Sequence, residues 1–273
     1  MMNHELRTII SDQPLTKPVK VSVITPVKNG ERFIRQTVES VFSQKGKFEL
    51  EYIIRDGCST DSTLEILKEY GNKIIVISKK DGSPQEAINA GMDMATGDIG
   101  CWLNADDIFL PETLQKIVEA FREHPEQGWV YGRCKIIDEK GIVIRKLITI
   151  YKNIIGYFYS RNILFCENYI NQPSTFWRMS LWKKACPLNP KYKAAWDYEL
   201  WLKMAQISSA HHLRDYLASF RRCEGTISET HFEQQFNEEL KISREYGTRV
   251  HAAIHTLLIK LRILIYKILS GAL

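Results

Sequence analysis

The chain has 273 residues, 44% of them hydrophobic and 25% charged, and a formal net charge of +5. Such a length fits one large α/β domain with appendages, or two small domains. The mild positive excess argues against a nucleic-acid-binding protein, and six scattered cysteines without a CxxC pair argue against a zinc site or a disulfide framework.

The N-terminal region is predicted to be a polar leader, residues 1–18, closed by Pro18. It lacks the apolar core of a signal peptide, and no uncharged run of the chain reaches the length of a membrane-spanning helix. Reduced thiols also fit a cytosolic protein. We therefore expect a cytoplasmic chain.

Residues 19–107 alternate between apolar, β-branched runs and patterns with helical spacing. The expected strands are VKVSVIT (19–25), EYIIRDG (51–57), KIIVIS (73–78) and DIGCWLNAD (98–106). A helix should follow each of the first three strands, and two of these helices start with capping-box spacing, at Ser62 with Glu65 and at Ser83 with Glu86. Fourfold strand–helix alternation predicts a parallel sheet covered by helices on both faces.

Polar residues follow the expected strands at the points where they end. Because ligands of parallel α/β sheets bind beyond the carboxyl ends of the strands, we expect these residues to converge on one edge. They are Thr25, Pro26, Asp56, Asp81, Asp106 and Asp107.

The second half of the chain is less regular. A hairpin is expected over residues 129–147, turning near Asp138–Gly141. The remaining expected elements are a helix near 153–161, a strand at 174–178, a helix around 195–205, an extended run at 211–222, and helices over 231–247 and 249–270.

Asp106 and Asp107 are adjacent carboxylates that repel each other unless a positive charge compensates them. Nearby lysines, the N-terminus of a helix beginning near Pro111, or a metal ion would each do so. A divalent cation holding a diphosphate is the economical interpretation, since Mg²⁺ and Mn²⁺ prefer oxygen ligands and few protein carboxylates. Single strand-end aspartates are more often helix caps.

Four motifs in this order and spacing resemble those of the family 2 glycosyltransferases. They are TPVKN (25–29), DGCSTDST (56–63), INAGMDMATGDIGCWLNADD (88–107) and WDYELWLK (196–203). The resemblance extends from Val19 to Arg222 and implies an inverting, nucleotide-sugar-dependent enzyme. The implied fold is GT-A: a mostly parallel, Rossmann-like α/β sheet with helices on both faces.

The resemblance also implies roles for individual residues. Asp56 matches the aspartate that binds the donor's base, usually uracil, while Thr25 and Pro26 match the loop lining that base. Asp81 matches a second nucleotide-side position. Asp106 and Asp107 match the DXD-type motif, where the first lies near the ribose and the second binds Mn²⁺ or Mg²⁺.

Asp197 matches the family's general base. Inversion by a single displacement needs a base for the acceptor hydroxyl and a cation for the leaving diphosphate, so a carboxylate distinct from the metal ligand is required. Trp196, Leu200 and Trp201 surround Asp197 in sequence, and desolvation there would raise its pKa. A structural role as a helix cap is the alternative.

Two further segments carry weaker matches. NQPSTFWR (171–178) stands where the family has an acceptor-side strand, with Asn171 in place of a frequent histidine. FRRCEGTIS (220–228) resembles a segment that closes over the diphosphate, and Arg222 is the arginine expected to reach the phosphates, with Arg221 as its alternative.

Residues 249–270 are the most apolar stretch, with Lys260, Arg262 and Lys267 at the edges of an apolar arc. This pattern predicts either a basic amphipathic helix on an anionic membrane surface or a terminal helix packed on the domain or on a partner subunit.

Together these observations predict a leader (1–18), a GT-A domain (19–230) and a C-terminal helical extension (231–273). Within the domain, residues 19–110 would bind the nucleotide sugar and residues 111–230 the acceptor. The expected activity is metal-dependent transfer from a nucleotide-diphosphate sugar, most simply a UDP-sugar, to a glycan or lipid-linked hydroxyl. The expected setting is bacterial surface polysaccharide or glycolipid synthesis at the inner face of the cytoplasmic membrane, by a protein that can form oligomers.

Two other functions remain as alternatives. A sugar nucleotidyltransferase would want a glycine-rich, cationic loop after the first strand, which TPVKNGERF does not supply. A non-catalytic nucleotide-sugar-binding or scaffold protein at a membrane would have no chemical need for both Asp107 and Asp197.

Overall fold

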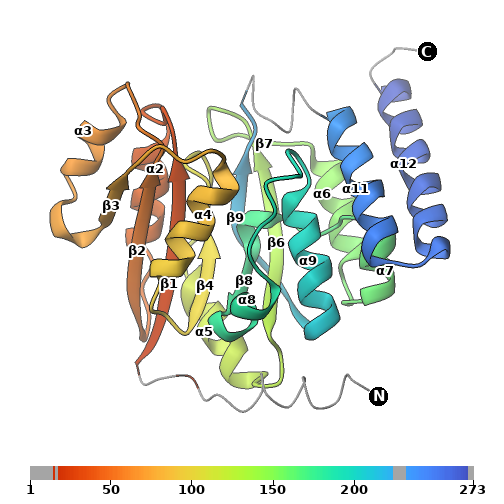
Figure 1. Ribbon diagram of the computed structural model, residues 1–273, viewed down its shortest axis with the longest axis horizontal. Coiled ribbons are helices and arrows are strands. Elements are labelled where there is room, and N and C mark those ends of the chain that lie inside the picture. The colour runs from red at the N-terminus through yellow and green to blue at the C-terminus, as the bar shows by residue number, and fades with distance from the viewer. Residues whose placement is uncertain (1–14, 16–17, 224–231, 270–273) are drawn as a thin grey trace.

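The computed structural model describes Leu15, residues 18–223 and residues 232–269 (Figure 1). The expected leader, apart from Leu15 and Pro18, lies outside the described residues, as does most of the segment expected to close over the diphosphate. The described strands form one sheet in the order β3-β2-β1-β4-β8-β6-β9-β5, with β7 paired to β6.

The first half of the sheet is parallel, as the alternating pattern predicts. Its strands are β1 (Val19–Val27), β2 (Phe48–Asp56), β3 (Ile75–Ser78) and β4 (Ile99–Trp102). The connecting helices are α2 (Ile34–Phe42), α3 (Thr63–Lys68) and α4 (Pro84–Met94), with a 3₁₀ turn at Gly71–Lys73. Gly91 lets α4 approach β1 closely, since a Cβ there would meet Ile24 Cγ2 at 2.6 Å.

The second half of the sheet is mixed in direction. Its strands are β5 (Ile108–Phe109), β6 (Trp129–Ile137), β7 (Val143–Ile144), β8 (Thr175–Arg178) and β9 (Ala210–Arg221). Antiparallel pairing of β8 with β4 joins the two halves, and β6 pairs in parallel with β9. The expected hairpin is confirmed, because β6 and β7 pair in antiparallel fashion around a turn at Asp138–Gly141.

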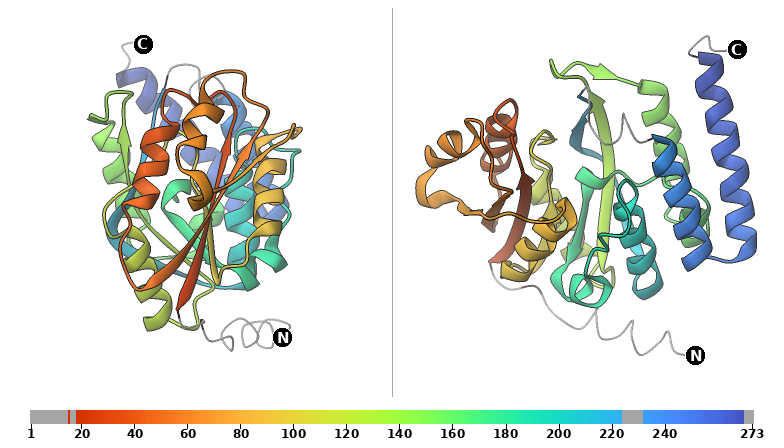
Figure 2. Two further views of the ribbon diagram at one scale, coloured as in Figure 1. Left: turned by 90° about the vertical axis from the view of Figure 1, so that its left-hand side faces the viewer. Right: turned by 45° about the horizontal axis from the view of Figure 1, so that its top comes forward.

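Helices cover both faces of the sheet (Figure 2). Those of the second half are α5 (Thr113–Glu123), α6 (Lys146–Ile155), α7 (Arg161–Cys166), α8 (Met179–Ala185), α9 (Trp196–Ile207), α11 (Phe232–Tyr246) and α12 (Arg249–Leu269), with a 3₁₀ turn at Gln172–Ser174. α12 packs against α7 and α11 at one end of the molecule. Within the described residues, no helix has the length and apolar character needed to cross a membrane.

Strand alternation divides the core into two layers. Cys101 of β4 and the neighbouring Leu103 face one layer with α2 and α5, while Trp102 faces the other. In that second layer the rings of Trp102 and Trp129 each stack on Trp201 of α9, with centroids 5.9 Å apart. This buried aromatic stack fixes α9, and therefore Asp197 in its first turn, against the sheet.

Three local expectations are wrong. Ser62 has φ −75° and ψ 11° and caps nothing, because Asp61 Oδ1 accepts the amide of Thr63 instead. The helix expected near 153–161 is two helices, α6 and α7, separated at Gly156, whose carbonyl accepts the Tyr131 hydroxyl. The short strand β5, which pairs with β9, was not expected at all.

Candidate active site

The carboxyl ends of the four parallel strands meet at one edge of the sheet. Val27 pairs with Asp56 and Asp56 with Ser78, while the amide of Leu103 donates to the carbonyl of Ile24. The strand-end segments expected to converge therefore lie along one edge: Thr25–Pro26, Asp56, Asp81 and Asp106–Asp107.

Asp56 ends β2 with a fully buried carboxylate. It accepts the amide of Ser59 at 3.2 Å and the hydroxyl of Ser78 at 2.5 Å. These bonds hold the loop after β2 and the end of β3 around one acceptor group. The carboxylate is thus oriented by its neighbours before any ligand arrives.

Thr25 and Pro26 point to opposite faces of β1. The Thr25 hydroxyl lies in the core, 3.0 Å from the hydroxyl of Tyr52, whereas Pro26 is half-buried. Only Pro26 can therefore offer its side chain to a ligand, and Thr25 contributes its backbone. Such a division between the two residues follows from strand alternation.

Asp81 is paired with Arg55 of β2. Arg55 Nη2 and Asp81 Oδ1 are 2.9 Å apart, and the two side chains are only 6% and 12% exposed. Asp81 Oδ2 has no hydrogen-bond partner among the described residues. This oxygen is buried, so it is an unsatisfied acceptor beside the end of β3.

Asp107 has a fully buried carboxylate bound on both oxygens. Oδ1 accepts the backbone amide of Arg221 at 2.8 Å, and Oδ2 accepts Asn104 Nδ2 at 3.1 Å. Its own carbonyl accepts the hydroxyl of Thr37 in α2 at 2.8 Å. These bonds tie the loop after β4 to β9 and to α2.

Neither a lysine nor a helix N-terminus compensates the aspartate pair. Among the described residues no lysine forms an ion pair with Asp106 or Asp107, and the capping position of α5 is Glu112, in a left-handed conformation with φ 65°. The nearby cation is Arg221, 2% exposed, whose Nε donates to the carbonyl of Asp106 at 2.8 Å. Its other donors bind Gln36 and the carbonyls of Asp138 and Glu139.

The two aspartates therefore keep an unusual electrostatic environment. Burial and the charge of Asp106 raise the pKa of Asp107 well above its usual range. Burial also raises the pKa of Asp106, against the opposing charge of Arg221. One buried and one half-buried carboxylate with incomplete compensation fit a hard divalent cation, which takes few protein carboxylates and completes its shell with phosphate and water. No cluster of three or more His, Cys, Asp and Glu ligands occurs among the described residues.

Asp197 lies in the first turn of α9. Burial raises its pKa to about 6, although the amide of Tyr198 donates to Oδ1 at 2.7 Å. The negative charge of Glu239 raises the pKa further, and the positive charge of Lys152 opposes it. A carboxylate with this pKa is ionised at neutral pH and basic enough to accept a hydroxyl proton.

Lys152 and Asn171 stand beside Asp197, and the sequence pattern gave no sign of the lysine. Lys152 Nζ donates to Asn171 Oδ1 at 3.1 Å, and burial lowers the pKa of Lys152 despite the charges of Glu239 and Asp197. Asn171, in the position of the family's frequent histidine, thus positions a cation next to the candidate base. The pairing joins α6 to the segment before β8, which no periodicity links.

Asn104 and Gln172 connect the two halves of the site. Asn104 Nδ2 reaches Gln172 Oε1 at 3.2 Å as well as Asp107, and Gln172 Nε2 donates to the carbonyl of Trp102 at 2.8 Å. This buried chain of amides fixes the aspartate loop relative to the segment that carries Asn171. The quoted motifs contain both residues, but their contact becomes visible only in the fold.

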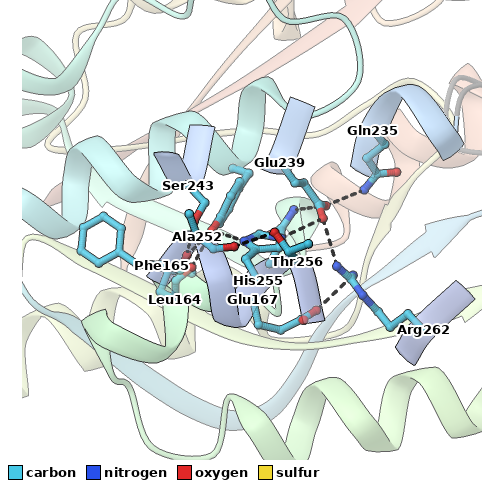
Figure 3. A network of polar contacts seen from close by, with 12 residues as sticks. Leu164, Phe165, Glu167, Gln235, Glu239, Ser243, Ala252, His255, Thr256 and Arg262 are labelled. Atoms are coloured by element: carbon cyan, nitrogen blue, oxygen red, sulfur yellow. Dashed lines mark hydrogen bonds and ion pairs between the residues drawn. The ribbon is translucent and has the colours of Figure 1, made fainter. Parts of the chain in front are cut away.

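A second buried network lies behind Asp197, between α7, α11 and α12 (Figure 3). Arg262 of α12 binds Glu167 at 3.0 Å and Glu239 at 3.2 Å. His255 lies 3.6 Å from Glu239 and 3.4 Å from the hydroxyl of Tyr198. Although burial opposes it, the neighbouring His255 and Arg262 lower the pKa of Glu239 to about 2, so its charge persists beside the base.

The remaining site residues are placed as follows. Glu199 faces inward, where it accepts the Tyr246 hydroxyl at 2.9 Å and pairs with Lys203 at 3.2 Å. Arg222 is half-buried, and its amide donates to the carbonyl of Ile137. Its neighbour Arg221 is committed to the aspartate loop.

An α/β sheet with acidic side chains at the carboxyl ends of its parallel strands and a base on a later helix is the arrangement of the GT-A glycosyltransferases. The chain belongs to glycosyl transferase family 2, because the sequence model of that family matches residues 22–183. The resemblance noted in the motifs is thereby confirmed.

Two relatives show how far the likeness extends. An uncharacterized glycosyltransferase of Rickettsia felis is 25% identical over 205 residues, which cover 70% of this chain and 32% of that protein. A PGL/p-HBAD biosynthesis glycosyltransferase of Mycobacterium bovis is 27% identical over 237 residues, covering 84% and 87%. The alignment thus spans about a third of the rickettsial relative and most of the mycobacterial one.

Solved structures confirm the fold. S. aureus TarS (residues 1–349) in complex with UDP-GlcNAc superposes with a TM-score of 0.65 at 23% identity, over 82% of this chain and 65% of that one. The mannosyltransferase PcManGT from Pyrobaculum calidifontis, in complex with GDP-Man and Mn²⁺, gives 0.64 at 16% identity, over 88% and 73%.

Proposed function

We propose that this chain transfers a glycosyl group, with inversion, from a nucleotide-diphosphate sugar to a hydroxyl of a glycan or lipid-linked acceptor. The observation that carries the proposal is the separation of two acidic groups. An incompletely compensated aspartate pair, with Asp107 fully buried and Asp106 half-buried, lies at the sheet edge, and Asp197, with a pKa of about 6, lies on a different element. Cation-assisted departure and base-assisted attack need this division.

The donor would lie along the edge of the parallel strands. Asp56 would accept a hydrogen bond from the base, Pro26 and the backbone of Thr25 would line it, and Asp81, whose buried Oδ2 has no hydrogen bond among the described residues, would serve the nucleotide. A UDP-sugar is the favoured donor. Its support is the match of Asp56 to the uracil-binding position and the UDP-GlcNAc complex of the similar TarS structure.

The diphosphate would lie near the aspartate pair. Asp107 would hold Mn²⁺ or Mg²⁺, Asp106 would lie near the ribose, and Arg222 would bind phosphate oxygens. The bound cation would neutralise charge on the leaving diphosphate. The fit of the donor set supports metal use, as does Mn²⁺ in the similar mannosyltransferase.

Transfer would be a single displacement at the anomeric carbon. Asp197 takes the proton of the acceptor hydroxyl as its oxygen bonds to the anomeric carbon, and the bond from that carbon to the diphosphate oxygen breaks. Lys152, held by Asn171, keeps Asp197 ionised, whereas the charge of Glu239 keeps it basic. The products are the inverted glycoside and the free nucleoside diphosphate.

The wider setting is part of the proposal. Residues 19–230 would be the catalytic domain, with donor-binding and acceptor-binding parts meeting near residue 110, and residues 231–273 a helical extension. A glycolipid or surface-polysaccharide acceptor at the inner face of a bacterial membrane is supported by the PGL/p-HBAD relative.

Calorimetric titration with UDP, GDP and dTDP, each with Mn²⁺ and with EDTA, tests the donor site. We expect one nucleotide, UDP, to bind, and only when the metal is present. Asp107→Asn should lose this metal-dependent binding. Asp197→Asn should bind UDP normally yet lose transfer. The wild-type rate should fall below about pH 6 as the base is protonated.

Two outcomes would contradict the proposal. Turnover retained by Asp197→Asn would show that Asp197 is not the general base. Metal-independent binding of all three nucleotides would show that Asp107 does not hold a cation required for donor binding. Normal donor binding without transfer to any hydroxyl acceptor would favour the nucleotide-sugar-binding scaffold. Formation of a nucleotide sugar from a sugar phosphate and a nucleoside triphosphate would favour the nucleotidyltransferase.

A further inference from the structure

The segment from Lys140 to Cys166, which contains β7, α6 and α7, has an unusual charge composition. It holds no aspartate or glutamate in 27 residues, although the chain has 32 of them in 273. Its five cations are Lys140, Arg145, Lys146, Lys152 and Arg161. A window of this length taken from the average chain would contain about three acidic residues, so the segment is distinctly basic.

The same segment exposes large apolar side chains on one side of α6. Leu147, Ile154 and Phe158 are 70%, 69% and 73% exposed, and Ile150 is 51% exposed. Leu147, Ile150 and Ile154 recur at three- and four-residue intervals, so they share one face of α6, and Phe158 follows three residues after the helix ends. Ile142 before the helix and Ile163 after it extend the exposed apolar surface, at 59% and 42%. We call this surface the α6 face.

A groove runs beside the α6 face. Its volume is about 480 Å³, and its lining combines Ile150, Ile154 and Phe158 with Tyr157, Arg133 and Tyr216. The ammonium of Lys135 lies 5.6 Å above the ring of Tyr216, and the guanidinium of Arg214 lies 4.5 Å above that of Tyr157. No described Asp or Glu forms an ion pair with Arg133, Lys135 or Arg214.

We propose that the α6 face docks on an anionic lipid surface. Exposed apolar side chains would enter the boundary between headgroups and acyl chains, while the cations around them meet lipid phosphates. A symmetric contact with a second copy of this chain fits less well, because it would set the same cations against each other without acidic partners. An acid-free, basic and apolar surface is complementary to a bilayer with negative headgroups.

This contact differs from the one that the apolar C-terminal stretch predicts. Val250, Leu257 and Leu261 of α12 are also exposed, at 65%, 66% and 50%. However, Arg262 of that stretch is turned inward and binds Glu167 and Glu239 in the interior. α12 therefore offers a matched comparison surface: it is similarly apolar and likewise free of Asp and Glu, whereas the α6 face has the groove beside it with Arg133, Lys135 and Arg214 around that groove.

Docking through α6 would also bring the membrane to the acceptor side of the site. The inner side of the same helix carries Thr149, 8% exposed, and Lys152, whose Nζ reaches Asn171 and whose charge acts on Asp197. Resting on the proposed function, this would bring a lipid-linked hydroxyl to the side of the site that carries Lys152 and Asn171. The docking itself needs no catalysis and is tested without it.

The test is co-sedimentation of the full chain with vesicles of phosphatidylcholine plus phosphatidylglycerol and with vesicles of phosphatidylcholine alone. We expect binding to the anionic vesicles only, weakened by salt. Ile154→Ser with Phe158→Ser should reduce the partition coefficient by roughly a hundredfold, at about tenfold per large apolar side chain. The matched variant on α12, Leu257→Ser with Leu261→Ser, should bind like the wild type.

Three outcomes would overturn the proposal. They are no binding to anionic vesicles, loss of binding in the α12 variant but not in the α6 variant, and a wild-type dimer that the α6 variant converts to a monomer. All four substituted positions are exposed, so thermal melting should show folded proteins. Metal-dependent UDP binding measured on the same samples keeps a failure of docking distinct from a failure of the proposed function.

Discussion

The role of general base that we propose for Asp197 comes with a cost to stability. Burial holds its pKa at about 6, above the ordinary 3.8, so the folded protein binds this proton more tightly than the unfolded chain. Stability is therefore full below pH 4, falls as the pH rises towards 6, and stays reduced above it. The property that suits Asp197 to accept a proton is the same one that weakens the fold at neutral pH.

We expect Asp197→Asn to stabilise the protein at pH 7.5 by about 1–3 kcal/mol and to have little effect at pH 3.5, since roughly two pKa units separate the two states. The asparagine oxygen can still accept the amide of Tyr198. Urea unfolding in EDTA at the two pH values measures the difference. Asp93→Asn on the exposed side of α4 is the control. Destabilisation at both pH values would show that Asp197 is a structural cap.

Some residues of the candidate site could be predicted from the sequence, and others could not. Asp56, Asp106 and Asp107 were found because each follows a short apolar run, and such runs end at the edge of a parallel sheet. Lys152 was not found, and Arg221 was considered only as a phosphate-binding alternative, since their contacts with Asn171 and Asp106 join distant elements. The spacing of apolar residues along the sequence carries no information about such contacts between distant elements.

α12 is held by charge as well as by apolar packing. Its Arg262 is 17% exposed, and it offsets Glu167 and Glu239, both 1% exposed. Burial raises the pKa of Glu167, so this carboxylate in particular relies on the arginine. An apolar arc indicated a helix here, but not that one of its cations points into the protein.

Replacing Arg262 by methionine should destabilise the fold by about 3–5 kcal/mol, because it leaves two buried carboxylates without their cation. Chemical unfolding measures the loss, with Lys260→Met, exposed on the same helix, as the matched control. Adding Glu167→Gln and Glu239→Gln to Arg262→Met should recover part of it. An Arg262→Met protein as stable as the control would show that α12 is held by apolar contacts alone.

The elements of the first half were predictable because they follow simple periods, whereas those of the second half do not. β1 to β4 are apolar runs separated by amphipathic helices, and their parallel order follows from that alternation. β5 has two residues and exists only because β9 pairs with it. The helix boundary at Gly156 depends on the hydroxyl of Tyr131, which lies 25 residues away. Tertiary contacts thus decide the local structure where the acceptor side is built.

In the proposed function, the two halves of the sheet carry complementary parts of one reaction. The pairing of β4 with β8 joins them, and the chain from Asp107 through Asn104 to Gln172 links their functional loops. Any ligand that engages the aspartate pair should therefore stabilise the chain as a unit. The pH dependence of that stabilisation follows from the raised pKa of Asp107.

We expect UDP with Mn²⁺ to raise the melting temperature by several degrees at pH 8 and much less at pH 5. Cation binding requires the ionised carboxylate, and protons compete for it with increasing success as the pH falls. With EDTA the shift should vanish at both pH values. Asp107→Asn should melt higher than the wild type in EDTA at pH 8, because the like charge beside Asp106 is gone, yet gain nothing from UDP and Mn²⁺. An equal ligand-induced shift of the melting temperature in wild type and Asp107→Asn would show that Asp107 does not bind the cation. The negative charge that weakens the free protein at high pH would then need an explanation other than the binding of a cation and a diphosphate.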